Sequence, residues 1–329
     1  MLLTFNSRAI AAAAVGAIVV FGTPSAAVRA DADERPVLVA TLSIWADISD
    51  QVDCDDHFDV QSLIPVGGDA HSYEPSIRDR DALDDAALVV ANGAGLEAQL
   101  HDTLDSVADD GTPVIEMAEH VTTRPMEGGG EDTATDETVG DEHADEDGHD
   151  HHEGDDPHIW FDPTLIIEGL PALGAALVAA GADETVTADC VATVTANLEE
   201  LDAEISEILS VVPNDQRQLV TNHDALGYFA NRYQFDVLGS VLPSSSTLVE
   251  ASPAELDELA DAIEAEDVPA IFAEALEATD DATTLGDRLG VDVVTLYTDS
   301  LGEAGSGAET YVDMMLFDAN AIATALAGR

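Results

Sequence analysis

Short apolar runs alternate with amphipathic stretches along most of the chain from residue 36 onward. Two of the intervening stretches, Asp47–Val52 and Ile77–Asp85, carry apolar residues at helical spacing. Short apolar runs separated by helical segments are typical of parallel strands joined by helices. The pattern therefore predicts an α/β fold with a mostly parallel sheet. The predicted strands of the first half are Val37–Ala40, Val60–Val66, Ala87–Ala91 and Val114–Ile115.

Two helices are predicted next, and the α/β alternation then resumes. The first covers Thr164–Ala180, and the second is a long helix that Asp183 opens and Pro213 ends. Its apolar spacing runs from residue 186 to 209, a length of about 36 Å at the usual helical rise. The chain is thus expected to form two similar α/β lobes joined by one long backbone helix. The later strands are predicted at 219–220, 237–242, 270–273 and 291–297, and the later helices at 224–233, 253–265, 282–289 and 311–327.

The first thirty residues resemble an export signal. Arg8 precedes an apolar stretch, Ala9–Gly22, and small residues that suit a cleavage site follow. The stretch is short for a membrane span, and the absence of a cysteine behind it gives no support to the usual lipid anchor. An uncleaved anchor stays open. We expect a signal peptide at 1–30, a first lobe at 36–182, the linking helix at 183–212 and a second lobe at 216–329, in an exported protein at the cell surface.

A segment of very different composition interrupts the first lobe. Of the 30 residues from 127 to 156, 14 are acidic and six are glycine, and no leucine, isoleucine or aromatic residue occurs. Such a composition cannot build a core, so a flexible acidic loop is predicted. Histidines crowd its second half, which suggests metal binding: His143, His149, His151 and His152.

Charge and cysteine content narrow the class of protein. The formal net charge is −58, and the apolar fraction of 46% is that of a globular chain. A nucleic-acid partner is excluded, because it needs a basic patch. High salt would screen the self-repulsion, so we interpret the acidity as adaptation to a very salty environment. Cys54 and Cys190 are either free buried thiols or, in an exported protein, a disulfide.

Polar donors follow three predicted strands. His71, His223 and Asp299 each stand just after a strand, where ligands of open α/β sheets bind. His158 lies between Pro157 and a Trp-Phe pair at the exit of the acidic loop. Three imidazoles and one carboxylate suit Zn²⁺, whereas Mn²⁺ would favour more oxygen donors. The spacing of the donors alone is weak support, because no local motif joins them.

Five ordered segments resemble the metal-binding solute receptors of ABC importers, the zinc and manganese cluster. The likeness runs from residue 37 to the end of the chain. Ala70 departs from it, since the family usually has proline there, and the lipid-anchor cysteine is missing. The matching segments are Gly68–Pro75, Asn92–Glu97, Asp156–Pro163, Asn222–Tyr233 and Tyr297–Leu301.

The resemblance implies two α/β lobes around a metal site with His71, His158, His223 and Asp299 as ligands. Histidine rather than glutamate at the third position resembles the zinc (ZnuA-like) branch, and so does the histidine-rich insertion. The family's long helix and second strand begin at the same end of the first lobe, which suggests a Cys54–Cys190 disulfide remote from the site. The implied partners are a membrane permease and its ATPase, with the receptor a monomer.

The function expected is capture of Zn²⁺ for transport, without catalysis. The alternatives are a manganese receptor of the same family, a secreted adhesin or metal buffer and, least favoured, a secreted zinc hydrolase, for which an open metal position and a motif such as H-E-x-x-H are missing. The four loop histidines are expected to bind metal weakly; the alternative is a solvated acidic loop whose histidines are incidental. Glu74, Asp162 and Glu274 either orient the ligands or serve as caps and surface charges. Protonation should weaken metal binding below about pH 6.5.

Overall fold

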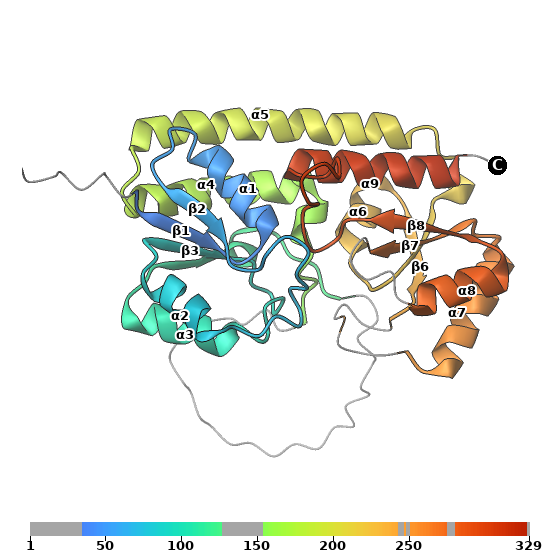
Figure 1. Ribbon diagram of the computed structural model, residues 1–329. Helices are drawn as coiled ribbons and strands as arrows, with labels where there is room; N and C mark the ends of the chain where they lie inside the picture. Colours follow the sequence, from blue (N-terminus) through green and yellow to red (C-terminus); the bar gives the residue numbers. More distant parts are fainter. Residues whose placement is uncertain (1–34, 127–153, 243–246, 248–250, 275–279, 328–329) are drawn as a thin grey trace, which may run out of the picture. The chain divides into compact units, whose positions relative to one another are not determined.

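Two four-stranded parallel sheets form the framework of the protein (Figure 1). The computed structural model describes residues 35–126, 154–242, 247, 251–274 and 280–327, which belong to one compact unit. The expected signal peptide and the loop histidines His143, His149, His151 and His152 lie outside the described residues. The elements are β1 (Val37–Ala40), α1 (Ser43–Val52), β2 (Asp59–Ser62), α2 (Ile77–Asp84), β3 (Leu88–Ala91), α3 (His101–Asp110), β4 (Val114–Glu116), η1 (Met117–His120), η2 (Ile159–Phe161), α4 (Pro163–Ala179), α5 (Glu184–Leu209), η3 (Asn214–Gln216), β5 (Gln218–Thr221), α6 (Gly227–Tyr233), β6 (Asp236–Ser240), α7 (Pro253–Glu266), β7 (Ala270–Glu274), α8 (Asp280–Leu289), β8 (Asp292–Leu296) and α9 (Tyr311–Leu326).

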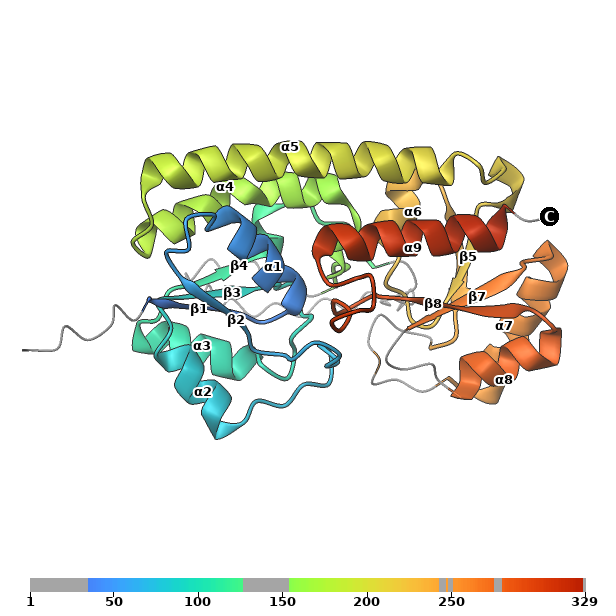
Figure 2. The same ribbon diagram turned by 45° about the horizontal axis from the view of Figure 1, so that its top comes forward.

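The two sheets repeat one topology. Their strand orders are β2-β1-β3-β4 and β6-β5-β7-β8, with every pair parallel. Helices cover both faces of each sheet, α1 and α4 opposite α2 and α3 in the first (Figures 1 and 2). A strand that is covered on both faces has a continuous run of apolar residues in its sequence, and all four residues of β3 are buried. The expected pair of α/β lobes is confirmed: the first lobe holds β1–β4 and the second β5–β8.

The long helix α5 connects the lobes. Asp183 caps it by accepting hydrogen bonds from the backbone N–H of Thr185 and Val186. Its 26 residues give a length of about 39 Å. One buried stripe packs against α4 and α1 of the first lobe and against α9 of the second (Figure 2). The stripe consists of Thr187, Cys190, Val194, Leu198, Leu201, Ile205 and Leu209.

A disulfide fastens this helix to the first lobe. Cys54, just after α1, is bonded to Cys190 in the second turn of α5, and their Cα atoms are 6.0 Å apart, within the range that a disulfide needs. The described chain has no free cysteine. The crosslink closes a loop with a sequence separation of 136 residues.

Several predicted boundaries shift in the structure. The second strand ends at Ser62 rather than Val66, because its partner β1 ends at Ala40, which pairs with Ser62. Helix α1 begins four residues earlier than predicted, and α6 begins at Gly227 because the preceding residues form the turn that carries His223. Helix α3 was not predicted; its apolar face is small, with Leu104 and Val107 buried.

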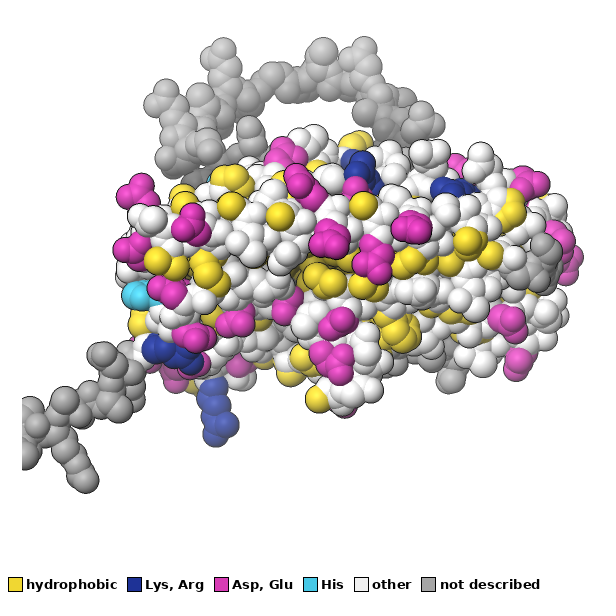
Figure 3. Space-filling model, turned by 90° about the horizontal axis from the view of Figure 1, so that it is seen from above, with side chains coloured by type: hydrophobic (Ala, Val, Ile, Leu, Met, Phe, Trp, Pro, Cys, Tyr) yellow, Lys and Arg dark blue, Asp and Glu magenta, His cyan; other side chains and the backbone are white. Residues whose placement is uncertain are grey.

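The surface carries the acidic charge. Asp and Glu side chains are spread over the face in Figure 3, where arginines are few. Among the described helices, none is both long and apolar enough to cross a bilayer.

Candidate metal centre

Four buried side chains from the two lobes converge on one point. His71 lies between β2 and α2, His158 directly before η2, His223 between β5 and α6, and Asp299 between β8 and α9. Parallel strands place their carboxyl ends at one edge of a sheet, so three of these loops leave the two sheets at their ligand-binding edges. One donor atom from each residue lies within 4.8 Å of the other three, and all four residues are buried. The structure thus brings together the residues singled out from the sequence.

The spacing between the donor atoms fits a small tetrahedral cation. Nε2 of His223 is 3.3 Å from Nε2 of His158 and 3.6 Å from Oδ2 of Asp299. Nε2 of His71 is 3.5 Å from Oδ2 of Asp299. A tetrahedral Zn²⁺ with bonds of about 2.0–2.1 Å requires donor separations of about 3.3–3.4 Å. These three separations are within a few tenths of an ångström of the tetrahedral values, and the four donor atoms together lie within 4.8 Å of one another.

Buried polar atoms without hydrogen-bond partners also fit a bound cation at this point. Among the described residues, His71 Nε2 and Asp299 Oδ1 are buried without a hydrogen-bond partner. Such groups cost free energy unless something else satisfies them. A divalent cation between the four side chains would satisfy both atoms at once.

Carboxylates orient two of the imidazoles from behind. Asp156 Oδ1 is 2.8 Å from Nδ1 of His158 and also accepts a hydrogen bond from its backbone N–H at 3.1 Å. Glu274 Oε1 contacts Nδ1 of His223. The sheet register explains the second contact: Thr221 of β5 pairs with Phe272 of β7, so His223 stands beside Glu274 two residues further on. Both contacts leave Nε2 facing the donor cluster.

The first histidine is held through its backbone. Asp69 Oδ1 accepts a hydrogen bond from the backbone N–H of His71 at 2.9 Å, and its Oδ2 accepts one from the Thr247 hydroxyl at 2.7 Å. Asp69 therefore links the loop of His71 to the second lobe.

The three carboxylates named from the sequence, Glu74, Asp162 and Glu274, have different roles in the structure. Glu274 contacts a site histidine, whereas Asp162 caps α4 through the backbone N–H of Thr164 and lies 3.8 Å from the Arg232 guanidinium. Glu74 is exposed. Sequence reasoning missed Asp156, although its position two residues before His158 suits a side chain that folds back onto the next residues.

Buried charges of opposite sign in the site stabilise each other. Burial lowers the pKa of His223, but the carboxylates of Glu274 and Asp299 outweigh it and raise the pKa to about 9. Burial raises the pKa of Asp299, yet the imidazoles of His223 and His71 hold it well below its ordinary value. His223 therefore carries a proton at neutral pH, and a cation must displace that proton to bind.

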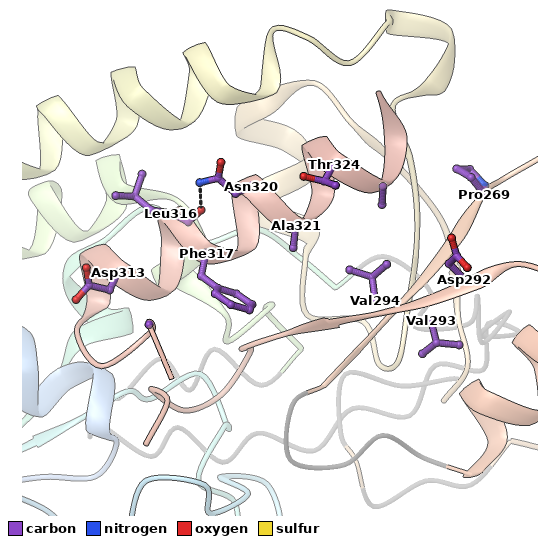
Figure 4. Close-up of a pocket in the computed structure, with 12 residues that line it drawn as sticks. Pro269, Asp292, Val293, Val294, Asp313, Leu316, Phe317, Asn320, Ala321 and Thr324 are labelled. Carbon is purple, nitrogen blue, oxygen red and sulfur yellow. Dashed lines mark hydrogen bonds between the residues drawn. The ribbon is translucent and has the colours of Figure 1, made fainter. Parts of the chain in front are cut away.

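A separate groove lies between α9 and β8 (Figure 4). Its volume is about 980 Å³, and its lining is mixed, with the apolar residues Val293, Leu316 and Phe317 beside the polar residues Asp292, Asp313 and Asn320. Within α9, Asn320 Nδ2 donates to the backbone carbonyl of Leu316 at 2.7 Å. The groove includes none of the four site residues.

Comparison with known proteins agrees with this geometry. The family model described as zinc-uptake complex component A, periplasmic, matches residues 38–325. The zinc-binding protein TroA of Treponema pallidum is 30% identical over 316 residues, which cover 93% of this chain and 92% of that protein. The manganese-binding lipoprotein MntA of Halalkalibacterium halodurans is 28% identical over 281 residues, 84% of each chain.

Solved structures share the fold. The periplasmic zinc-binding protein TroA of Treponema pallidum superposes with a TM-score of 0.75 at 27% identity, over 89% of this chain and 99% of that one. A Mn-bound periplasmic metal-binding protein from Candidatus Liberibacter asiaticus superposes with a TM-score of 0.73 at 20% identity, over 88% and 99%, which shows the fold alone. The chain belongs to the zinc-uptake complex component A family, whose members are metal-binding receptors of ABC transporters rather than enzymes.

Proposed function

We propose that this protein is an exported receptor that captures Zn²⁺ and delivers it to a membrane ABC permease and its ATPase. His71, His158, His223 and Asp299 are the proposed ligands. The observation that carries the proposal is the buried meeting point of these side chains, where three donor separations are close to those of a tetrahedral zinc site. Two ligands come from each lobe, so binding and release of the cargo are linked to how the lobes close.

The choice of zinc rests on the donor types. Three imidazole nitrogens and one carboxylate match the borderline character of Zn²⁺, whereas Mn²⁺ favours oxygen. His223 supplies the decisive nitrogen, and the similarity to a zinc-binding protein at 30% identity supports the same choice.

A competition experiment tests the metal and the site together. We expect Zn²⁺ to bind more tightly than Mn²⁺ when each competes for the protein against a chelator of known affinity. His223→Ala should lose tight binding of both metals, while His120→Ala, which changes an exposed histidine, should bind like the unaltered protein. Tighter binding of Mn²⁺ would refute the zinc assignment, and tight binding by His223→Ala would refute the site.

A manganese receptor is the second candidate. Manganese-binding relatives are 28% identical to this chain. Both oxygens of Asp299 face the imidazoles, with Oδ1 3.8 Å from Nε2 of His158 and Oδ2 3.5 Å from Nε2 of His71. A carboxylate that binds through both oxygens would give Mn²⁺ a second oxygen donor. The competition experiment distinguishes the two metals directly.

The histidine-rich insertion is proposed to hold additional metal weakly. Its described ends are joined by an antiparallel bridge between Pro125 and Asp155, directly before Asp156. The insertion therefore begins and ends beside the carboxylate that contacts His158. Deleting residues 141–154 should lower the number of Zn²⁺ ions bound and leave the tight site intact; loss of the tight site would contradict this division.

A further inference from the structure

A buried polar network lies on the first-lobe side of His158. Asn92, directly after β3, is fully buried, and Glu97 is 4% exposed. Neither residue belongs to the donor cluster. Because a buried amide or carboxylate costs free energy unless it is hydrogen-bonded, the partners of these two side chains indicate their role.

The Asn92 side chain makes three hydrogen bonds. Its Oδ1 accepts from Nε1 of Trp45 at 2.9 Å. Its Nδ2 donates to the backbone carbonyl of Gly93 at 3.1 Å and to that of Pro157 at 2.9 Å. The Pro157 carbonyl belongs to the peptide group that leads directly into His158. Asn92 thus fixes the backbone from which that imidazole projects.

Glu97 in turn fixes Asn92. Its carboxylate accepts hydrogen bonds from the backbone N–H of Asn92 at 2.8 Å and of Gly93 at 3.2 Å. It also accepts one from the Thr41 hydroxyl at 2.5 Å. The turn it closes is strained, because Ala94 has a φ of 52°, which non-glycine residues rarely adopt. The carboxylate therefore stabilises a backbone that would otherwise relax and move Asn92.

Other hydrogen bonds connect the segment around His158 to the second lobe and to α9. Asn92 connects the same segment to the first lobe, since it follows β3, a strand inside the first sheet. The segment around His158 is therefore hydrogen-bonded to both lobes. The bonds to the second lobe and α9 run from the Tyr228 hydroxyl to the Asp156 carbonyl at 2.8 Å, from Trp160 Nε1 to the Thr298 carbonyl at 2.9 Å, and from the Tyr311 hydroxyl to the Trp160 carbonyl at 2.6 Å.

We infer that Asn92, held by Glu97, is a positioning residue that keeps His158 on the first-lobe half of the metal site. The inference rests on the proposed role of His158 as a ligand. Without the amide, the segment would follow its second-lobe attachments, and the Nε2 atom of His158 would leave the position that the other three donors require. Metal affinity and coordination geometry should both change, since partners behind the ligands typically contribute about 10- to 100-fold in metal affinity.

The test compares Asn92→Ala and Glu97→Gln with the unaltered protein. Zn²⁺ affinity is measured by competition with a chelator, and Co²⁺ serves as a spectroscopic probe, because its visible absorption reports coordination geometry. We expect Asn92→Ala to bind Zn²⁺ at least tenfold more weakly and to shift the Co²⁺ bands. Glu97→Gln keeps the side-chain size but turns one acceptor into a donor, so a smaller change of the same sign is expected. If Asn92→Ala does not fold, Glu97→Gln decides.

Two controls separate positioning from general destabilisation and from failure of the proposed function. Ile263→Ala opens a cavity in the second-lobe core and should lower Tm without changing Zn²⁺ affinity or the Co²⁺ bands. His158→Ala should lose tight binding. Wild-type affinity and Co²⁺ bands in Asn92→Ala and Glu97→Gln, or equal losses in Ile263→Ala, would overturn the inference while His158→Ala still loses metal. Tight binding by His158→Ala would instead overturn the proposed function.

Discussion

Gly227 lies against the carboxylate of Asp156, which contacts His158, so we expect a side chain at position 227 to weaken metal binding. A Cβ atom on Gly227 would lie 2.6 Å from Oδ2 of Asp156 and 2.6 Å from a guanidinium nitrogen of Arg124. The arginine can swing away, but the other oxygen of Asp156 is bonded to His158. Restoring an ordinary contact of 3.4 Å requires the carboxylate to move by about 0.8 Å. The His158 ring must follow or lose its partner.

Gly227→Ala should therefore weaken Zn²⁺ binding about 10- to 100-fold, equivalent to about 1.4–2.7 kcal/mol. Without the contact the change would be neutral or stabilising, because alanine favours a helix over glycine by up to about 1 kcal/mol. The assay is chelator competition at constant salt. Gly239→Ala is the matched control, since its Cβ would meet only the end of the Leu259 side chain at 3.0 Å. Equal Zn²⁺ affinity in both variants and the unaltered protein would refute the coupling from Gly227 through Asp156 to His158.

Two further predictions concern stability. Replacing Cys54 and Cys190 by serine opens a 136-residue loop and should lower the free energy of unfolding by up to about 5 kcal/mol in urea denaturation, while Zn²⁺ affinity stays unchanged; a loss below about 1 kcal/mol would contradict the loop-entropy reasoning. The pKa of His223 rises from 6.5 to about 9 on folding, so its proton stabilises the metal-free protein fully below about pH 6.5, and this contribution is lost as pH rises through 9. Because Zn²⁺ displaces that proton, the Tm gain on adding Zn²⁺ should grow from about pH 6 to pH 9, and a pH-independent gain would be inconsistent with a protonated His223.

The raised pKa of His223 also changes an expectation from the sequence. An ordinary imidazole competes with metal only below about pH 6.5. With Glu274 and Asp299 beside it, His223 retains its proton up to about pH 9. Neither the burial nor the register that creates this environment is visible in the sequence, so the pH range of proton competition could not be predicted from residue types.

The roles of the residues that contact the ligands could not be predicted from the sequence. The sequence offered Glu74, Asp162 and Glu274 alike, either as residues that orient the ligands or as caps and surface charges. The pairing of β5 with β7 sets Glu274 against His223, while Asp162 caps a helix. The role of Asn92 was also hidden, since its contact with the Pro157 carbonyl joins residues 65 positions apart.

The sequence by itself determined the two α/β lobes, the long helix and the three polar residues, His71, His223 and Asp299, that follow strands. These features depend on local properties: apolar periodicity, helix caps and the tendency of strand ends to carry ligand-binding groups. The tertiary structure alone decided how closely His71, His158, His223 and Asp299 approach one another, with donor atoms within 4.8 Å, and which buried groups hold them there. Those relations depend on strand register and on the packing of both lobes along α5, and therefore on contacts between residues far apart in the chain.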